Sequence, residues 1–264
     1  MPYLLHEWLN VIVRWTHVFA GILWIGQTYY FTWLDARLSD PKEEGQVWMV
    51  HSGGFYAVAK QKSPAAGRTL HWFKWEAAMT WLSGIILLVL VYYMGGLMLA
   101  AGDSRLTLGQ AIAVSIGLLP LAWLVYDALW QSPLARSYTL AAVISYLLLV
   151  ATTWGLIQIL SARAAYMHVG VIMGTLMAAN VWMRILPAQR RLVATAREGS
   201  EPDQALATRA KLRSKHNTYM VIPVVFIMLS SHFPVATYGH RYNWLILAGL
   251  ILAGWVAAHI IRKH

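Results

Sequence analysis

The sequence predicts an all-α integral membrane protein that forms a single domain over residues 1–264. Hydrophobic residues make up 58% of the chain and charged residues only 12%, against about 25% charged residues in soluble globular domains. The 14 Trp and 13 Tyr residues fit the aromatic belts that membrane proteins place at the two bilayer surfaces. Apolar stretches of about 20 residues, the length that a helix needs to cross a bilayer, recur along the chain.

Seven such stretches predict a bundle of about seven transmembrane helices. They lie at about 10–33, 76–100, 108–130, 138–160, 165–186, 217–234 and 243–261. Most of the 21 Lys and Arg residues fall in segments 34–75, 131–137 and 184–216 and in the C-terminal tail. With seven spans, these four segments all lie on the same side of the membrane. The positive-inside rule then predicts an N-terminus outside and a C-terminus in the cytoplasm.

The two long connections carry signals of their own. Gly53 and Gly54 predict a turn between short amphipathic pieces near the membrane surface. The polar segment Glu198–Asp203 predicts a break, and Ala205–Lys215 a basic helix that runs into the sixth span. We also expect Pro223 to bend that span.

Charge and cysteine content exclude several classes of function. The net charge of +10 is explained by loops that orient the protein in the membrane, and without a basic domain or motif we expect no nucleic-acid partner. The absence of cysteine excludes disulfides, thiolate metal sites and a covalent c-type haem within these residues.

Three histidines are expected toward the outer leaflet. His17 lies inside the first span, where an ionisable side chain is costly and rarely faces lipid. Imidazoles from separate helices, beside small residues and aromatic walls, are typical of haem b held in a membrane bundle. We therefore predict that the haem iron binds His17 and His168, with His232 as a third candidate. The alternative is that each ring only hydrogen-bonds to a carbonyl or a serine.

A second polar group is expected at the inner boundary of the spans. It predicts a site for a planar anionic ligand, because it combines aromatic rings, cations and groups that can move a proton. The predicted catalytic residues are His71, Glu76 and His216, and the predicted substrate-binding residues are Lys74, Arg213, Asn217 and Tyr219. Two alternatives remain: cations that only reach toward the membrane surface, and a second haem between His71 and His216.

Long motifs in this chain resemble one family. They lie within Arg14–Phe31, Gly53–Tyr56, Leu70–Gly84, Met167–Gln189 and Arg213–His232, and they are similar to those of the membrane-bound urate hydroxylase (urate oxidase) family. The likeness covers nearly the whole chain. It implies a multi-pass protein of the bacterial inner membrane that oxidises urate to 5-hydroxyisourate in purine catabolism.

The resemblance also implies an electron acceptor. Members of the family pass electrons to a C-terminal cytochrome c domain, whereas these 264 residues end just after the last span. We therefore expect either a separate cytochrome c or a longer parent protein, and a homo-oligomer stays open. Two other functions are compatible with the residues: a haem-binding electron-transfer subunit without its own substrate site, and a proton-coupled transporter.

Overall fold

The protein folds as a helical bundle with one small hairpin. A computed structural model describes residues 2–61, 68–100, 102, 105–201 and 203–263. The helices are α1 (Tyr3–Arg37), α2 (Trp75–Leu87), α3 (Leu108–Gln131), α4 (Tyr138–Ile157), α5 (Ala162–Ala179), α6 (Leu186–Arg197), α7 (Gln204–Ser230) and α8 (Asn243–Ile261). Two π-helical segments, η2 (Leu88–Tyr93) and η4 (Asn180–Ile185), continue α2 and join α5 to α6. Two short 3₁₀ turns, η1 (Pro41–Glu43) and η3 (Pro133–Arg136), follow α1 and α3.

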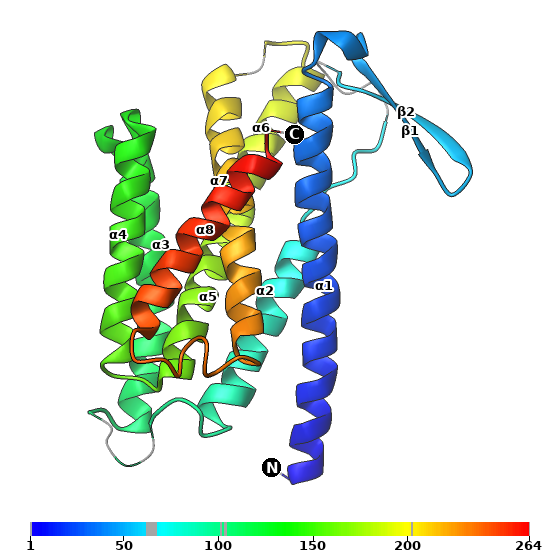
Figure 1. The fold of residues 1–264 in the computed structure, drawn as a ribbon. Coiled ribbons are helices and arrows are strands. Elements are labelled where there is room, and N and C mark those ends of the chain that lie inside the picture. The colour runs from blue at the N-terminus through cyan, green and yellow to red at the C-terminus, as the bar shows by residue number, and fades with distance from the viewer. Residues whose placement is uncertain (1, 62–67, 101, 103–104, 202, 264) are drawn as a thin grey trace.

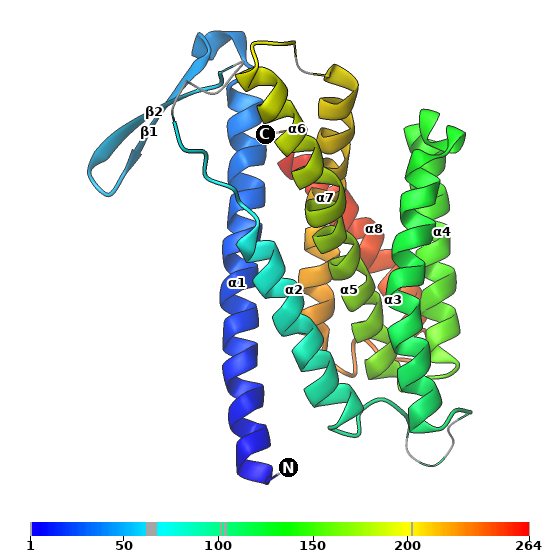
Figure 2. The same cartoon turned by 180° about the vertical axis from the view of Figure 1, so that it is seen from behind.

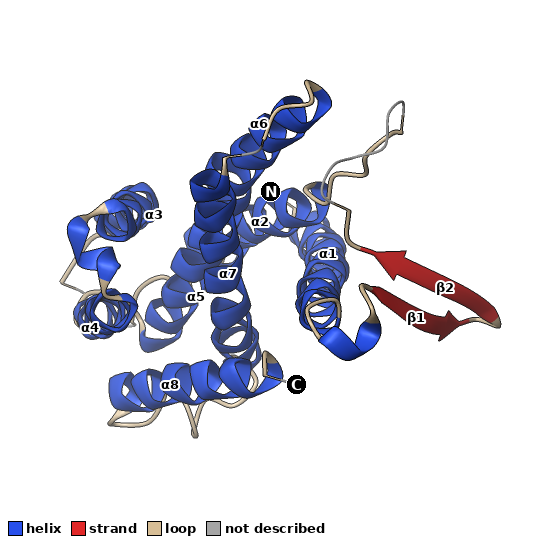
Figure 3. Ribbon diagram, turned by 90° about the horizontal axis from the view of Figure 1, so that it is seen from above, coloured by secondary structure: helices blue, strands red, loops and turns tan. Residues whose placement is uncertain are grey.

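Helices α5 and α7 form the centre of the bundle. Seen from above, α1 and α2 lie on one side of this pair, α3 and α4 on the other, and α8 crosses a third side (Figure 3). The two termini lie at opposite ends of the bundle, and the C-terminus shares its end with α6 and the start of α7 (Figures 1 and 2). The basic segments predicted to face the cytoplasm therefore gather at one end.

Among the described residues, six helical stretches are long and apolar enough to cross a membrane. They are Tyr3–Arg37, Trp75–Tyr93, Leu108–Gln131, Tyr138–Ile157, Ala162–Arg197 and Asn243–Ile261. The stretch predicted at 217–234 forms the second half of α7, whose first half is basic. A multi-pass membrane protein is thus supported, whereas the count of seven spans and the orientation stay predictions.

Several predicted boundaries need correction. The second span was expected to reach residue 100, but the helix ends at Tyr93. The fifth was expected to end at 186, but α5, η4 and α6 continue to Arg197. The predicted basic helix before the sixth span is confirmed, and α7 continues through Pro223 without a break.

The starts of four helices are fixed by side chains that accept backbone N–H groups, as short polar residues do at N-caps. Thr107 and Gln110 form a reciprocal capping box at the start of α3. Ser137, Ser161 and Asp203 cap α4, α5 and α7. These polar residues, placed between apolar runs, explain why the helices begin where they do.

The prediction of an all-α fold is wrong at one place. Strands β1 (Gln46–His51) and β2 (Gly54–Ala59) pair antiparallel, with Gln46 opposite Ala59 and His51 opposite Gly54. The predicted turn is confirmed, because Ser52 and Gly53 both adopt positive φ angles, as a tight two-residue hairpin requires. The alternating apolar residues fit a strand as well as an amphipathic helix, which is why this sequence pattern misled the prediction.

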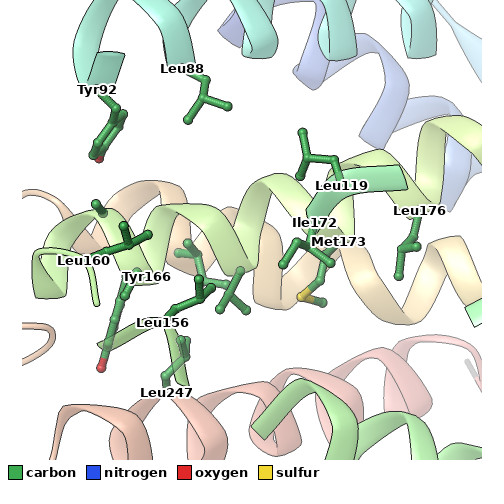
Figure 4. Packing of buried hydrophobic residues seen from close by; sticks show 14 of the residues in the cluster. Leu88, Tyr92, Leu119, Leu156, Leu160, Tyr166, Ile172, Met173, Leu176 and Leu247 are labelled. Carbon is green, nitrogen blue, oxygen red and sulfur yellow. The ribbon is translucent and has the colours of Figure 1, made fainter. Parts of the chain in front are cut away.

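The hydrophobic core surrounds α5. Tyr166, Ile172, Met173 and Leu176 of α5 pack with side chains from α2–η2, α3, α4 and α8 (Figure 4). Eleven residues of α5 are buried, so this helix has little surface for lipid. Its polar residues must therefore find partners within the bundle.

A close helix contact yields the first testable prediction. A Cβ added at Gly254 of α8 would lie 2.8 Å from Cδ of Pro223 in α7, whereas one at Gly249 of the same helix would meet nothing within 4 Å. Gly254→Ala is expected to destabilise the protein by about 1–3 kcal/mol through overpacking, and Gly249→Ala to leave stability nearly unchanged. Thermal unfolding in detergent micelles measures both, and equal effects of the two variants would contradict the predicted contact.

Candidate functional site

A cavity of about 660 Å³ lies between α1, α2, α5 and α7, and we call it the main cavity. Its walls are largely apolar and aromatic, with a few polar and cationic side chains, as in most small-molecule sites. The residues that bear on its chemistry are Arg14, His17, Thr80, Tyr92, Arg163, Ser231 and His232. Glycines line it as well: Gly21, Gly84, Gly170 and Gly174.

His17 enters this cavity with one ring nitrogen already held. Its Nδ1 lies 2.9 Å from the carbonyl oxygen of Thr80 and 3.1 Å from Oγ of Ser83. In the tautomer that donates from Nδ1 to the carbonyl, the lone pair of Nε2 stays free, which is the arrangement that metal-binding histidines use. A Cβ at Gly84 would lie 3.0 Å from Cε1 of His17, so a glycine there lets the ring approach α2.

His232 lines the same cavity from the end of α7. It follows the last helical residue, Ser230, and its backbone N–H donates to the carbonyl of Leu229. The hydrogen bonds of the described residues include none to its ring. The structure thus brings two of the three predicted haem ligands, His17 and His232, to one cavity.

Two arginines give the cavity a cationic region. Arg14 lies one helical turn before His17, and its Nε donates to Oδ1 of Asn10 over 2.7 Å. Nε of Arg163 is buried without a hydrogen-bond partner, which is costly unless a ligand supplies an acceptor. A bound carboxylate would satisfy this group.

These features fit haem b. The cavity has the size of a cofactor site, small residues that leave room for a flat ring, free imidazole nitrogens and cations for carboxylate substituents. Within the described ranges, no group of three His, Asp or Glu side chains comes together as a bare metal ion would require.

The structure does not bring His168 to the main cavity with His17. His168 is fully buried, and it faces α3 rather than the main cavity. Its Nε2 lies 2.7 Å from Oγ of Ser115, and its Nδ1 lies 2.7 Å from the carbonyl of Ala164. Because both nitrogens have protein partners, this histidine follows the alternative interpretation of a hydrogen-bonded core residue.

The inner group of predicted residues separates into two parts. The first part lies at the start of α2 and contains His71, Lys74 and Glu76. His71 packs edge-on against Phe73, with ring centroids 4.6 Å apart. Nζ of Lys74 lies 5.2 Å from the ring centre of Trp75 and 6.0 Å from that of Trp182. Oε2 of Glu76 is buried without a partner.

The other part lies on α7 and already has protein partners. Arg213 is 5% exposed and donates to Oδ1 of Asp127 over 2.8 Å. Arg184 forms an ion pair with the same carboxylate. Asp127 of α3 therefore joins α7 to η4 through two cations.

Amide and phenol groups complete this second part. Asn217 accepts from Nδ2 of Asn180 over 2.9 Å and donates to the carbonyl of Met177 over 3.0 Å. Tyr219 lies 3.0 Å from Nδ1 of His259, and Nδ1 of His216 lies 2.6 Å from the hydroxyl of Tyr126. Because these groups are engaged with one another, they do not form one open site with His71, Lys74 and Glu76.

Sequence reasoning missed several residues of these networks. No cofactor-binding role was predicted for Arg14 or Arg163, and Tyr126 and Asn180 were not singled out. Asn180 begins the π-helical segment η4, a distortion that is frequent at functional sites. The available signal for Asn180 was an amide within an apolar run. Nothing in the sequence distinguishes Arg163 from an arginine that only sets the orientation of the chain in the membrane.

The comparison with known families shows which family the chain belongs to. The family model described as urate oxidase N-terminal matches residues 3–264. The chain belongs to the urate oxidase N-terminal family. No curated protein and no solved structure matches it. Membership of the urate oxidase N-terminal family confirms the resemblance and supports a urate-related function.

Proposed function

We propose that this chain is the membrane domain of an oxidoreductase that converts urate to 5-hydroxyisourate and passes the electrons to a cytochrome c. Urate and water give 5-hydroxyisourate, two protons and two electrons. The observation that carries the proposal is the match to the urate oxidase N-terminal family over residues 3–264, together with a cavity that two imidazoles enter.

In this proposal the main cavity holds haem b, which when bound supplies a one-electron acceptor within the bilayer. His17 and His232 are the ligands of the iron, since the Thr80 carbonyl fixes the ring of His17 and both side chains line the cavity. Arg14 and Arg163 bind the propionate groups. His168 keeps its structural role between α3 and α5.

Urate binds at the start of α2, near His71, Lys74 and Glu76. Among the described residues, no hydrogen bond to these three side chains is present, and Oε2 of Glu76 is buried without a partner. The ammonium of Lys74 offsets the charge of the urate anion, and the carboxylate of Glu76, buried and unpartnered, accepts a proton from it. Glu76 lies one helical turn before Thr80, which holds His17. Helix α2 therefore connects the substrate group with the main cavity.

The decisive experiment adds urate anaerobically to the oxidised, purified protein while the visible spectrum is recorded. Reduction of the haem bands with formation of 5-hydroxyisourate supports the proposal. A haem protein that urate neither reduces nor binds would instead be an electron-transfer subunit. A colourless protein from haem-replete cells would overturn the cofactor assignment.

The proposed proton acceptor gives a second prediction. Glu76→Gln keeps the shape of the side chain but removes its basicity, so the rate of haem reduction by urate is expected to fall about 10²- to 10⁴-fold. Glu7→Gln, near the N-terminus, is the matched control and should leave the rate unchanged. A Glu76→Gln protein with the wild-type rate would exclude this carboxylate as the base.

A further inference from the structure

A second cavity, of about 330 Å³, lies among α3, α4, α5, α7 and α8. It is on the other side of the α5–α7 pair from the main cavity, whose walls come from α1, α2, α5 and α7. We call it the side cavity. No residue of the proposed urate or haem sites lines it.

The side cavity opens onto an apolar outer face of the bundle. Three of its lining residues are apolar and well exposed on the outside of the bundle: Leu121 at 56%, Val125 at 42% and Leu148 at 43%. In a membrane-spanning bundle such a surface faces acyl chains. Because the other walls are also mostly aliphatic or aromatic, the cavity suits a ligand that partitions into the membrane.

Two polar atoms inside this apolar wall have no hydrogen-bond partner in the part of the chain that the structure describes. His216 is 6% exposed, and its Nε2 is one of them. Nε1 of Trp255 is also buried without a partner. A buried polar group that is left unsatisfied destabilises a protein, so both atoms indicate that a ligand completes the site.

The partner of His216 decides what kind of ligand this is. The hydroxyl of Tyr126 lies 2.6 Å from Nδ1. When the phenol donates to Nδ1, the ring proton of the neutral imidazole is on Nε2. The indole N–H can only donate. The side cavity therefore offers two donors to a ligand that carries acceptor oxygens on an apolar body.

Aromatic rings add a preference for a flat ligand. The ring centroid of Trp130 lies 4.1 Å from that of His216, and Tyr138 lies 6.1 Å from it. Urate is a poor fit here, because polar atoms around its whole rim would lose their hydrogen bonds in an apolar wall.

We propose that the side cavity binds a membrane quinone, with a carbonyl oxygen accepting from Nε2 of His216. This inference rests on the proposed function for its electrons: urate and water release two electrons and two protons, and the quinone takes up both to become a quinol. As the quinone takes up two electrons, Nε2 of His216 gives its proton to one quinone oxygen while the hydroxyl of Tyr126 gives its proton to Nδ1. The two protons that the oxidation of urate releases then restore Tyr126 and protonate the second quinone oxygen. The quinone is then a lipid-soluble electron acceptor beside the soluble cytochrome c.

Binding is measured on the intact chain in nanodiscs of quinone-free phospholipid, titrated with a short-chain ubiquinone. His216→Leu and Trp255→Phe are each expected to weaken binding about tenfold, the effect of losing one hydrogen bond. The matched controls are His51→Leu in the hairpin and Trp154→Phe, whose side chain faces lipid on α4. Both controls should bind as the wild type does.

A photoreactive azidoquinone locates the site in the same preparation. Cross-links to peptides of α3, α7 and α8 that a non-reactive quinone suppresses support the proposal. His216→Gln keeps a hydrogen-bond donor and serves as a second variant. It should bind the quinone more tightly than His216→Leu does. If His216→Leu fails to fold, His216→Gln should still bind the quinone with measurable affinity.

Unchanged affinity in both His216→Leu and Trp255→Phe would overturn the proposal, as would cross-links confined to α1 and α2. Equal suppression of cross-linking by added phospholipid would show a lipid site instead. The binding assay contains no urate, so its result does not depend on the proposed function. Quinone binding by a protein whose haem bands urate does not reduce would count against the proposed function and leave the quinone site standing.

Discussion

Replacing Asp127 with leucine is expected to destabilise the protein by about 3–5 kcal/mol, because it leaves a buried arginine without its counter-charge. The side chain of Asp127 is 9% exposed and that of Arg213 is 6% exposed. The guanidinium of Arg213 also lies 4.9 Å from the ring centre of Tyr126. A displaced Arg213 would therefore disturb the hydrogen bond between Tyr126 and His216. Thermal and chemical unfolding in detergent micelles measure the change.

The second cation on this carboxylate provides the control. The side chain of Arg184 is 38% exposed, so solvent and lipid headgroups screen its charge, and Arg184→Leu should cost about 1 kcal/mol or less. The double variant Asp127→Leu with Arg213→Met should recover much of the stability, since an apolar pair can replace a buried ion pair. An Asp127→Leu protein as stable as the wild type would show that this ion pair does not stabilise the bundle.

For the proposed haem site, His17→Ala is expected to lower the haem-to-protein ratio of the purified protein by about tenfold or more. The reason is that His17 supplies a ring nitrogen to the main cavity while its other nitrogen is held by Thr80. Absorbance of the haem bands relative to protein, measured after purification from haem-replete cells, gives the ratio.

His168→Gln is the matched control, since the amide can replace one of the hydrogen bonds to Ser115 and Ala164. It should keep its haem and lose only stability. Loss of haem from both variants would restore the pairing of His17 with His168 that the sequence predicted. Haem kept in His17→Ala would refute the assignment to the main cavity.

Composition and apolar run length were sufficient to predict the helices. Polar caps such as Thr107 and Asp203 mark where α3 and α7 begin, because the first N–H groups of a helix need acceptors. The helix formed by α2 and η2 ends at Tyr93, just before Gly95 and Gly96, and Gly96 adopts a positive φ of 73°. Glycine at such a position is a common helix stop signal, but the apolar residues that follow it led the prediction on to residue 100.

The site was harder to predict than the fold. His17 and His232 were recognised because an imidazole in an apolar run is costly. The sequence could not distinguish the role of His168 from theirs. A buried imidazole can be stabilised equally well by binding a cofactor or by hydrogen bonds to Ser115 and the carbonyl of Ala164. Which of these applies depends on the neighbouring helix and the direction of each side chain.

The sequence by itself determined that this chain is helical, with several apolar stretches long enough to cross a membrane, and that it belongs to the urate oxidase N-terminal family. Hydropathy and local motifs depend only on residues close together in the chain. The tertiary structure decided which histidines share a cavity, that Asp127 joins Arg184 and Arg213, and that the inner polar residues form two groups. These outcomes depend on contacts between residues far apart in the chain. Such contacts are set by how helices pack against one another, and helix periodicity carries little information about that packing.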